Sequence, residues 1–198
     1  MTETTFPETQ EAEMKPDQKR SLAEELLRNA IGHFEANKAE LERRVALGAS
    51  FEDWLNARFM RACNRLGEMM AVTEAAYAGL TDDNWEGPIS RERLDLFAVR
   101  LLDGVPAFVE CAIVHRTTHD KWRAKIAWDA EKLRRIDRDD VLKMVVVYCC
   151  SVAQDVLTDP TWTEWIDGIE FGAVEKLPPL SFPIGNGGQF ALMAWIVP

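Results

Sequence analysis

The spacing of hydrophobic positions changes near the middle of the chain, from helical periodicity to short apolar runs. In the first part, apolar residues recur every three or four positions, which is typical of amphipathic helices. The pattern predicts one helix over 21–47 and a second over 50–80, separated by Gly48. Ser21 followed by Glu24 has the form of a capping box at the start of the first helix. We expect the two helices to pack antiparallel or at a steep angle.

After Ser90 the apolar runs become short and rich in β-branched residues, which indicates strands. Two of these runs flank Asp103-Gly104, a dipeptide typical of hairpin turns. The elements expected after Ser90 are strands over 94–102 and 107–115, a helix over 120–136, a buried strand over 141–150 parallel to the preceding strand, a short helix over 162–169, a strand over 170–175, a loop over 177–188 and a closing strand over 189–197.

Together these elements predict one α/β domain, with a mixed central sheet and flanking helices. The polar N-terminal residues 1–20 carry no apolar face and are expected to be disordered. The domain would then span 21–198. Its parts are a helical pair over 21–80, a core over 91–150 and a C-terminal extension over 151–198 that ends in the closing strand.

Composition and charge indicate where the protein is located and what it can bind. No apolar run reaches the roughly 18 residues that a membrane helix needs, and the N-terminus lacks a secretory signal, so we expect no membrane contact. The four cysteines show no disulfide or zinc spacing, which favours a reducing cytoplasm. The net charge of −10 argues against broad nucleic-acid binding. Between His115 and Arg138, however, eight Lys and Arg residues stand against four acidic ones, so DNA could bind at the Arg116–Arg138 patch.

Two acidic residues on the expected hairpin are candidates for chemistry. Asp95 lies near the start of its first strand and Glu110 in the middle of the second. Since Glu110 stands in the apolar run FVECAIV, its carboxylate needs a hydrogen-bonding partner, a counter-charge or a metal ion.

The order of elements and the phrase WDAEKLRRI resemble the PD-(D/E)xK nuclease superfamily over about residues 50–150. The resemblance implies a restriction-endonuclease-like core of helix, three-stranded meander, helix and strand, here preceded by two N-terminal helices. It also implies that Asp95 and Glu110 hold Mg²⁺, joined by a helix acid for which Glu52 is the nearest match and Glu68 a second one. A lysine of this motif orients or activates the attacking water.

The chain departs from that motif at Ala112, where the superfamily has lysine or another polar residue. Three interpretations follow. The lysine could be replaced by Lys125 or Lys121 of the following helix, the site could bind a metal without cutting well, or the site could be inactive.

Other roles are open for the same residues. Asp95 could pair with Arg91 or Arg93, and Glu110 with Arg100. The run KLRRIDR could be a solvated helix face. A zinc site formed by Cys111, His115 and His119 lacks the compact spacing of such sites.

Two functions therefore compete. The first is a Mg²⁺-dependent nuclease. The second is a catalytically silent protein on the same scaffold that acts through contacts with a partner protein or a second copy, which is suggested by Ala112 and the acidic C-terminal third. The arrangement of Asp95 and Glu110 separates them, because a metal site requires the two carboxylates to converge on a groove with a lysine nearby.

Overall fold

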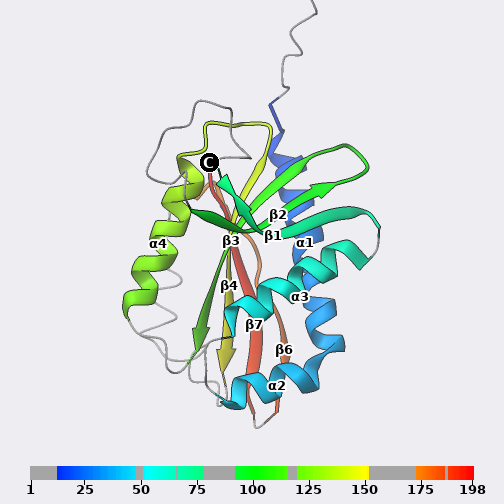
Figure 1. Ribbon diagram of the computed structural model, residues 1–198, viewed down its shortest axis with the longest axis vertical. Coiled ribbons are helices and arrows are strands. Elements are labelled where there is room, and N and C mark those ends of the chain that lie inside the picture. The colour runs from blue at the N-terminus through cyan, green and yellow to red at the C-terminus, as the bar shows by residue number, and fades with distance from the viewer. Residues whose placement is uncertain are drawn as a thin grey trace, which may run out of the picture.

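The chain forms a mixed α/β structure with four helices and a curled sheet in its described part (Figure 1). The computed structural model describes residues 13–47, 51–65, 67–77, 92–115, 120–151, 173–185 and 187–198. The elements are α1 (Pro16–Ala36), α2 (Lys38–Leu47), α3 (Glu52–Arg65), β1 (Met69–Ala76), β2 (Arg93–Arg100), β3 (Pro106–His115), α4 (Asp120–Arg134), β4 (Leu142–Ser151), β5 (Glu175–Lys176), β6 (Leu180–Pro183) and β7 (Gln189–Ile196).

The strands form one sheet in the order β1-β2-β3-β4-β7-β5, and β6 also pairs with β7. Strands β1, β2 and β3 make an antiparallel meander. Strand β4 lies parallel to β3, as the sequence predicts. Helix α4 connects the two strands and returns the chain to the end of the sheet at which β3 begins. From α3 to β4 the order is helix, three strands, helix, strand.

Helices cover both faces of the sheet (Figure 1). Side chains of β3 alternate between these faces, since successive residues of a strand point to opposite sides. Cys111 and Ile113 pack with residues of α1, α2 and α3, whereas Ala112 and Val114 pack with residues of α4. The almost continuous apolar sequence of β3 therefore results from burial on both sides.

The N-terminal region differs from the sequence prediction. The expected helix over 21–47 is two helices, α1 and α2, with a turn at Asn37 between them. Helix α1 begins at Pro16, which suits a first helical turn because proline lacks the amide that would stay unpaired there. The predicted cap at Ser21 is therefore wrong. Disorder up to residue 20 is also wrong for residues 13–20, and residues 1–12 lie outside the described part.

The second expected helix, over 50–80, is wrong beyond Arg65. Helix α3 ends there, and Gly67 follows with φ of 70°, a left-handed conformation that glycine adopts without strain. Met69–Ala76 then forms β1. Met69 and Ala71 are buried and Met70 is exposed, so the spacing that resembled a helical stripe is the alternation of a strand.

The later elements agree more closely with the sequence. Strands over 94–102, 107–115, 141–150 and 189–197 and the helix over 120–136 are confirmed within a few residues by β2, β3, β4, β7 and α4. The loop over 177–188 is wrong in part, because Leu180–Pro183 forms β6. The predicted helix over 162–169 lies outside the described residues, and near the predicted strand over 170–175 only the short β5 is described.

Two further observations concern the setting of the protein. All four cysteines are free and buried. Among the described helices, none is both long and apolar enough to cross a membrane.

Candidate functional site

The candidate site lies where β2 and β3 separate. The paired residues of the two strands run from Val99 opposite Pro106 to Leu96 opposite Val109. Beyond it, the amide of Cys111 donates a hydrogen bond of 2.8 Å to Asp95 Oδ2. The amide of Ile113 donates one of 3.2 Å to Glu52 Oε2, from the first turn of α3. Side-chain carboxylates therefore accept hydrogen bonds from backbone amides of β3 where that strand is no longer paired with β2.

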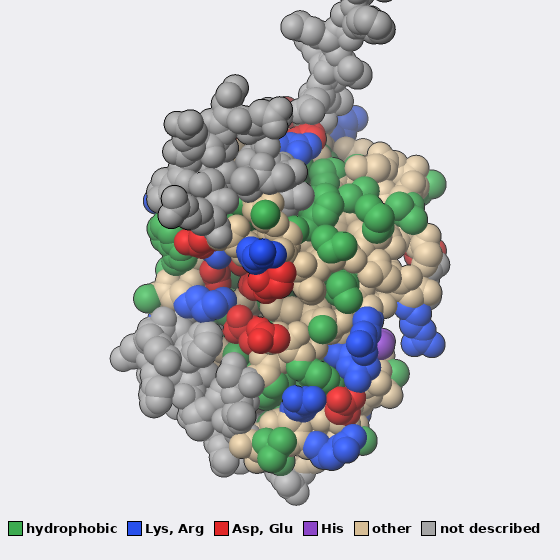
Figure 2. Space-filling view, in the orientation of Figure 1, with side chains coloured by type: hydrophobic (Ala, Val, Ile, Leu, Met, Phe, Trp, Pro, Cys, Tyr) green, Lys and Arg blue, Asp and Glu red, His purple; other side chains and the backbone are tan. Residues whose placement is uncertain are grey.

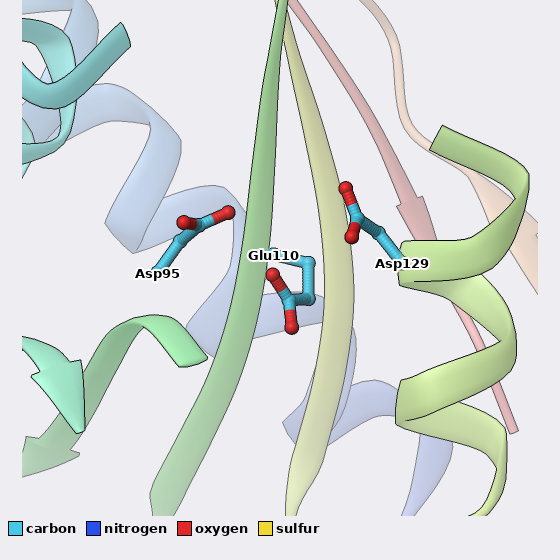
Figure 3. A group of neighbouring side chains, drawn as sticks. All are labelled: Asp95, Glu110 and Asp129. Atoms are coloured by element: carbon cyan, nitrogen blue, oxygen red, sulfur yellow. The ribbon is translucent and has the colours of Figure 1, made fainter. Parts of the chain in front are cut away.

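Three carboxylates from different elements meet at this separation (Figure 3). Asp95 comes from β2, Glu110 from β3 and Asp129 from α4, and one oxygen of each lies within 4.8 Å of the others. Glu110 and Asp129 are 1% and 2% exposed, whereas Asp95 is half-buried. Such a grouping needs cations nearby, because like charges at this distance repel strongly in a buried place.

Lys132 supplies one of these cations. Its Nζ lies 2.8 Å from Glu110 Oε1 and 2.9 Å from Asp129 Oδ1. Glu92 Oε2 is 3.4 Å away on the more exposed side. The hydroxyl of Tyr77 donates a hydrogen bond to Glu110 Oε1 as well. Glu110 is therefore held by an ammonium group and a phenol at the same oxygen.

Lys125, two turns of α4 earlier, supplies the other cation. Its Nζ lies 2.9 Å from Asp129 Oδ2 and 3.3 Å from Glu52 Oε1. It also donates a hydrogen bond of 2.9 Å to the carbonyl oxygen of Cys111. Its side chain is 33% exposed, so solvent reaches the cluster from this side.

The site as a whole keeps an excess of acidic groups, because five carboxylates surround the two lysines. Burial, followed by the charges of Asp95 and Asp129, raises the pKa of Glu110 well above its ordinary value of 4.5, although Lys132 opposes this. Burial also raises the pKa of Glu52. For both lysines, burial lowers the pKa but the surrounding carboxylates outweigh it, so both pKa values rise and both ammonium groups stay charged at neutral pH.

The structure brings together four of the residues that the sequence singles out, namely Asp95, Glu110, Glu52 and Lys125. Lys121 lies in α4, but its side chain is outside the described part. Glu68, the other candidate for the helix acid, lies beyond the end of α3 and is exposed.

The alternative roles fare differently. Arg100 pairs with Asp103 and Glu25, so it is not the partner of Glu110. Arg93 donates to the carbonyl of Glu74. The buried thiol of Cys111 accepts a hydrogen bond from the hydroxyl of Tyr148. The predicted partner Arg91 lies outside the described residues, as do His119 and the side chain of His115.

Sequence reasoning missed Asp129, Lys132 and Tyr77. A signal existed for Asp129, which lies three residues after Ile126 and four before Leu133, both fully buried. A carboxylate at that spacing stands on the buried face of the helix, where it needs a partner.

The basic patch over Arg116–Arg138 is largely neutralised where its side chains are described. Lys125 and Lys132 are directed into the carboxylate cluster. Arg134 and Arg135 pair with Glu131, and Arg138 pairs with Asp140. Figure 2 accordingly shows acidic and basic side chains intermixed where β3 and α4 lie.

Comparison with known proteins adds no identification, since no family model, curated protein or solved structure matches the chain.

Proposed function

We propose that the chain is a divergent protein of the PD-(D/E)xK type that hydrolyses phosphodiester bonds with the help of a divalent cation. The observation that carries this proposal is the convergence of Asp95, Glu110 and Asp129 from β2, β3 and α4. The order helix, three strands, helix, strand from α3 to β4 supports it, because that order is the one implied by the resemblance of the sequence.

The donor set fits a hard cation such as Mg²⁺. All three groups offer carboxylate oxygens, which are the ligands that this ion prefers. Asp95 is the most accessible of the three, and Glu52 adds a fourth carboxylate nearby. When bound, the ion would lower the pKa of a water molecule and stabilise the charge that develops on phosphorus.

Lys125 would take the role of the lysine that Ala112 replaces. Ala112 is fully buried under α4, whereas the Lys125 ammonium reaches the carbonyl of Cys111 next to it. Because its pKa is raised, Lys125 stays protonated and cannot act as a base. It can donate hydrogen bonds to a water molecule or to a phosphate oxygen, and so stabilise negative charge there.

A second function is favoured by Lys132. Its ammonium already bridges Glu110 and Asp129, and Glu110 is almost completely buried. A cluster neutralised by its own lysines is typical of a structural ion-pair network. In that case the protein is a catalytically silent scaffold that acts through contacts with other proteins.

Cleavage assays distinguish the two functions. Single- and double-stranded DNA and RNA are incubated with the full chain in Mg²⁺, Mn²⁺ or EDTA. We expect cleavage only with a metal ion, and a loss of about a hundredfold or more in Asp95→Asn, as for other positioned charged groups. Asp53→Asn, at an exposed position of α3, is the matched control and should keep the activity. Absence of cleavage on every substrate, with a melting temperature that ignores Mn²⁺, would favour the silent scaffold.

A further inference from the structure

A second candidate site lies between α1 and α3, away from the carboxylate cluster. It is a pocket of about 260 Å³. Its lining consists of Arg28, Asn29, Gly32 and His33 from α1, with Ala62 and Arg65 from α3. The residues that line the pocket carry two guanidinium groups, a carboxamide and an imidazole.

Several polar atoms at this pocket lack a partner. Asn29 Nδ2 and both ring nitrogens of His33 are buried without a hydrogen-bonding partner among the described residues. Buried polar atoms without a hydrogen bond are rare in folded proteins. Folding removes their hydrogen bond to water, and the loss costs free energy unless another partner replaces it. Because Asn29 and His33 line the pocket, a group bound there could supply the missing bonds.

The surroundings of the pocket are positively charged. Burial lowers the pKa of His33, and Arg58, Arg65 and Arg61 of α3 lower it further, so the imidazole stays neutral and can donate one N–H. Arg28 shares its charge with Glu24 at 3.4 Å, and Arg58 pairs with Glu40. Figure 2 shows several Lys and Arg side chains on the side where α1 and α3 lie.

We propose that this pocket binds a phosphate group. Guanidinium groups match the geometry of phosphate oxygens, and the carboxamide and the neutral imidazole add donors. The pocket is large enough for a phosphate group and for part of a larger molecule that carries one. The group could belong to free phosphate or to a nucleic-acid backbone, and the chemistry of recognition is the same. The site does not depend on the carboxylate cluster or on the function proposed for it.

A titration in EDTA tests the proposal on the full chain. Inorganic phosphate is added at constant ionic strength to wild type, Arg65→Gln and Arg43→Gln, and binding is followed by NMR and calorimetry. Arg43 is the matched control because it is exposed and lies on α2, outside the pocket. We expect Arg65→Gln to weaken phosphate binding about tenfold and Arg43→Gln to change it less than about twofold, since a charge-assisted hydrogen bond is lost only in the first.

Two further arms complete the test. A short single-stranded oligonucleotide that binds more tightly than phosphate, with the same dependence on Arg65, identifies a backbone phosphate as the source; binding of phosphate alone identifies a free anion. Asp95→Asn should bind phosphate as wild type does, which separates this site from the proposed nuclease site. The proposal is overturned if phosphate does not bind at millimolar concentration, or if Arg43→Gln weakens binding as much as Arg65→Gln.

Discussion

At the scale of single residues, Glu110 stands under opposing influences. Burial and the carboxylates of Asp95 and Asp129 favour its protonated form, whereas Lys132 favours the ionised one. The net effect is a raised pKa, so the folded protein binds this proton more tightly than the unfolded chain does. The stability that Glu110 contributes is therefore complete below pH 4.5 and is lost as the pH rises through its folded-state pKa.

Glu110→Gln tests this sign. Glutamine has nearly the shape of the protonated acid and does not ionise. In EDTA we expect the variant to become more stable than wild type as the pH rises from 5 to 8, by roughly 1 kcal/mol or more, because only wild type has a buried carboxyl group to ionise. Chemical denaturation at several pH values measures this difference. A variant that is less stable by about 3 kcal/mol at pH 8 would instead show that Glu110 acts mainly as the ionised partner of Lys132.

Lys132→Met probes the same cluster from the other side. The change leaves Glu110 and Asp129 buried without their shared ammonium, so we expect a loss of about 3–5 kcal/mol in the free energy of unfolding in EDTA. If the carboxylates can hold a divalent cation, Mn²⁺ should raise the melting temperature of this variant more than that of wild type. Lys38→Met, at a more exposed position, serves as the control. A variant that Mn²⁺ does not rescue would contradict the metal site.

At the scale of elements, sequence patterns predict well those segments whose periodicity has one interpretation. Strands β3 and β4 are long, apolar and β-branched, and α4 carries a clear buried stripe of Ile126, Ala130 and Leu133. Strand β1 is different, because its apolar residues fit a helical spacing continued from α3 as well as the alternation of a strand. The sheet decides between them, since β2 offers β1 an antiparallel ladder along most of its length.

The site could be predicted only in part for a related reason. Asp95 and Glu110 stand out because acidic residues are unusual in apolar strands. Asp129 and Lys132 lie three residues apart on a charged helix, where such pairs usually face solvent. Their importance depends on which face of α4 packs against the sheet, and this is set by contacts between distant parts of the chain.

Two glycines provide a test at the scale of elements. Gly67, with φ of 70°, follows the end of α3 and allows the turn into β1, so Gly67→Ala should destabilise the protein by about 1 kcal/mol. Gly32 lies inside α1 with open space at the position that a Cβ atom would take, so Gly32→Ala should stabilise the protein by roughly 0.5–1 kcal/mol. Urea denaturation of both variants measures the two changes. If both substitutions stabilised the protein, or both destabilised it, the left-handed conformation of Gly67 or the helical conformation of Gly32 would be contradicted.

At the scale of the whole molecule, the beginning of α1 is tied to the segment that follows α4. Met14 is 4% exposed, and its amide donates a hydrogen bond of 3.1 Å to the carbonyl of Asp139. Arg20, in α1, pairs with Glu175 of β5. Residues just before and within the first turns of α1 therefore join segments that are far apart in the sequence.

Two truncations separate this docked region from the residues before it. We expect removal of residues 1–12 to leave the melting temperature nearly unchanged, because they are polar and lack an apolar face. Removal of residues 1–18 also deletes Met14, and we expect it to lower the melting temperature by about 4–8 °C, from a loss of roughly 2 kcal/mol. Thermal melts of the two truncated chains measure the difference. Equal melting temperatures would show that Met14 contributes little.

The separation of β2 from β3 has a consequence for hydrogen exchange. The amide protons of Cys111 and Ile113 are held by carboxylates of Asp95 and Glu52, so their exchange with solvent depends on side chains. Asp95→Ala should speed the exchange of Cys111, and Glu52→Ala that of Ile113, while the amide of Val145 in the neighbouring β4 keeps its rate. NMR measures these exchange rates residue by residue. The rates of the two amide protons therefore show when a ligand binds the carboxylate of Asp95 or Glu52.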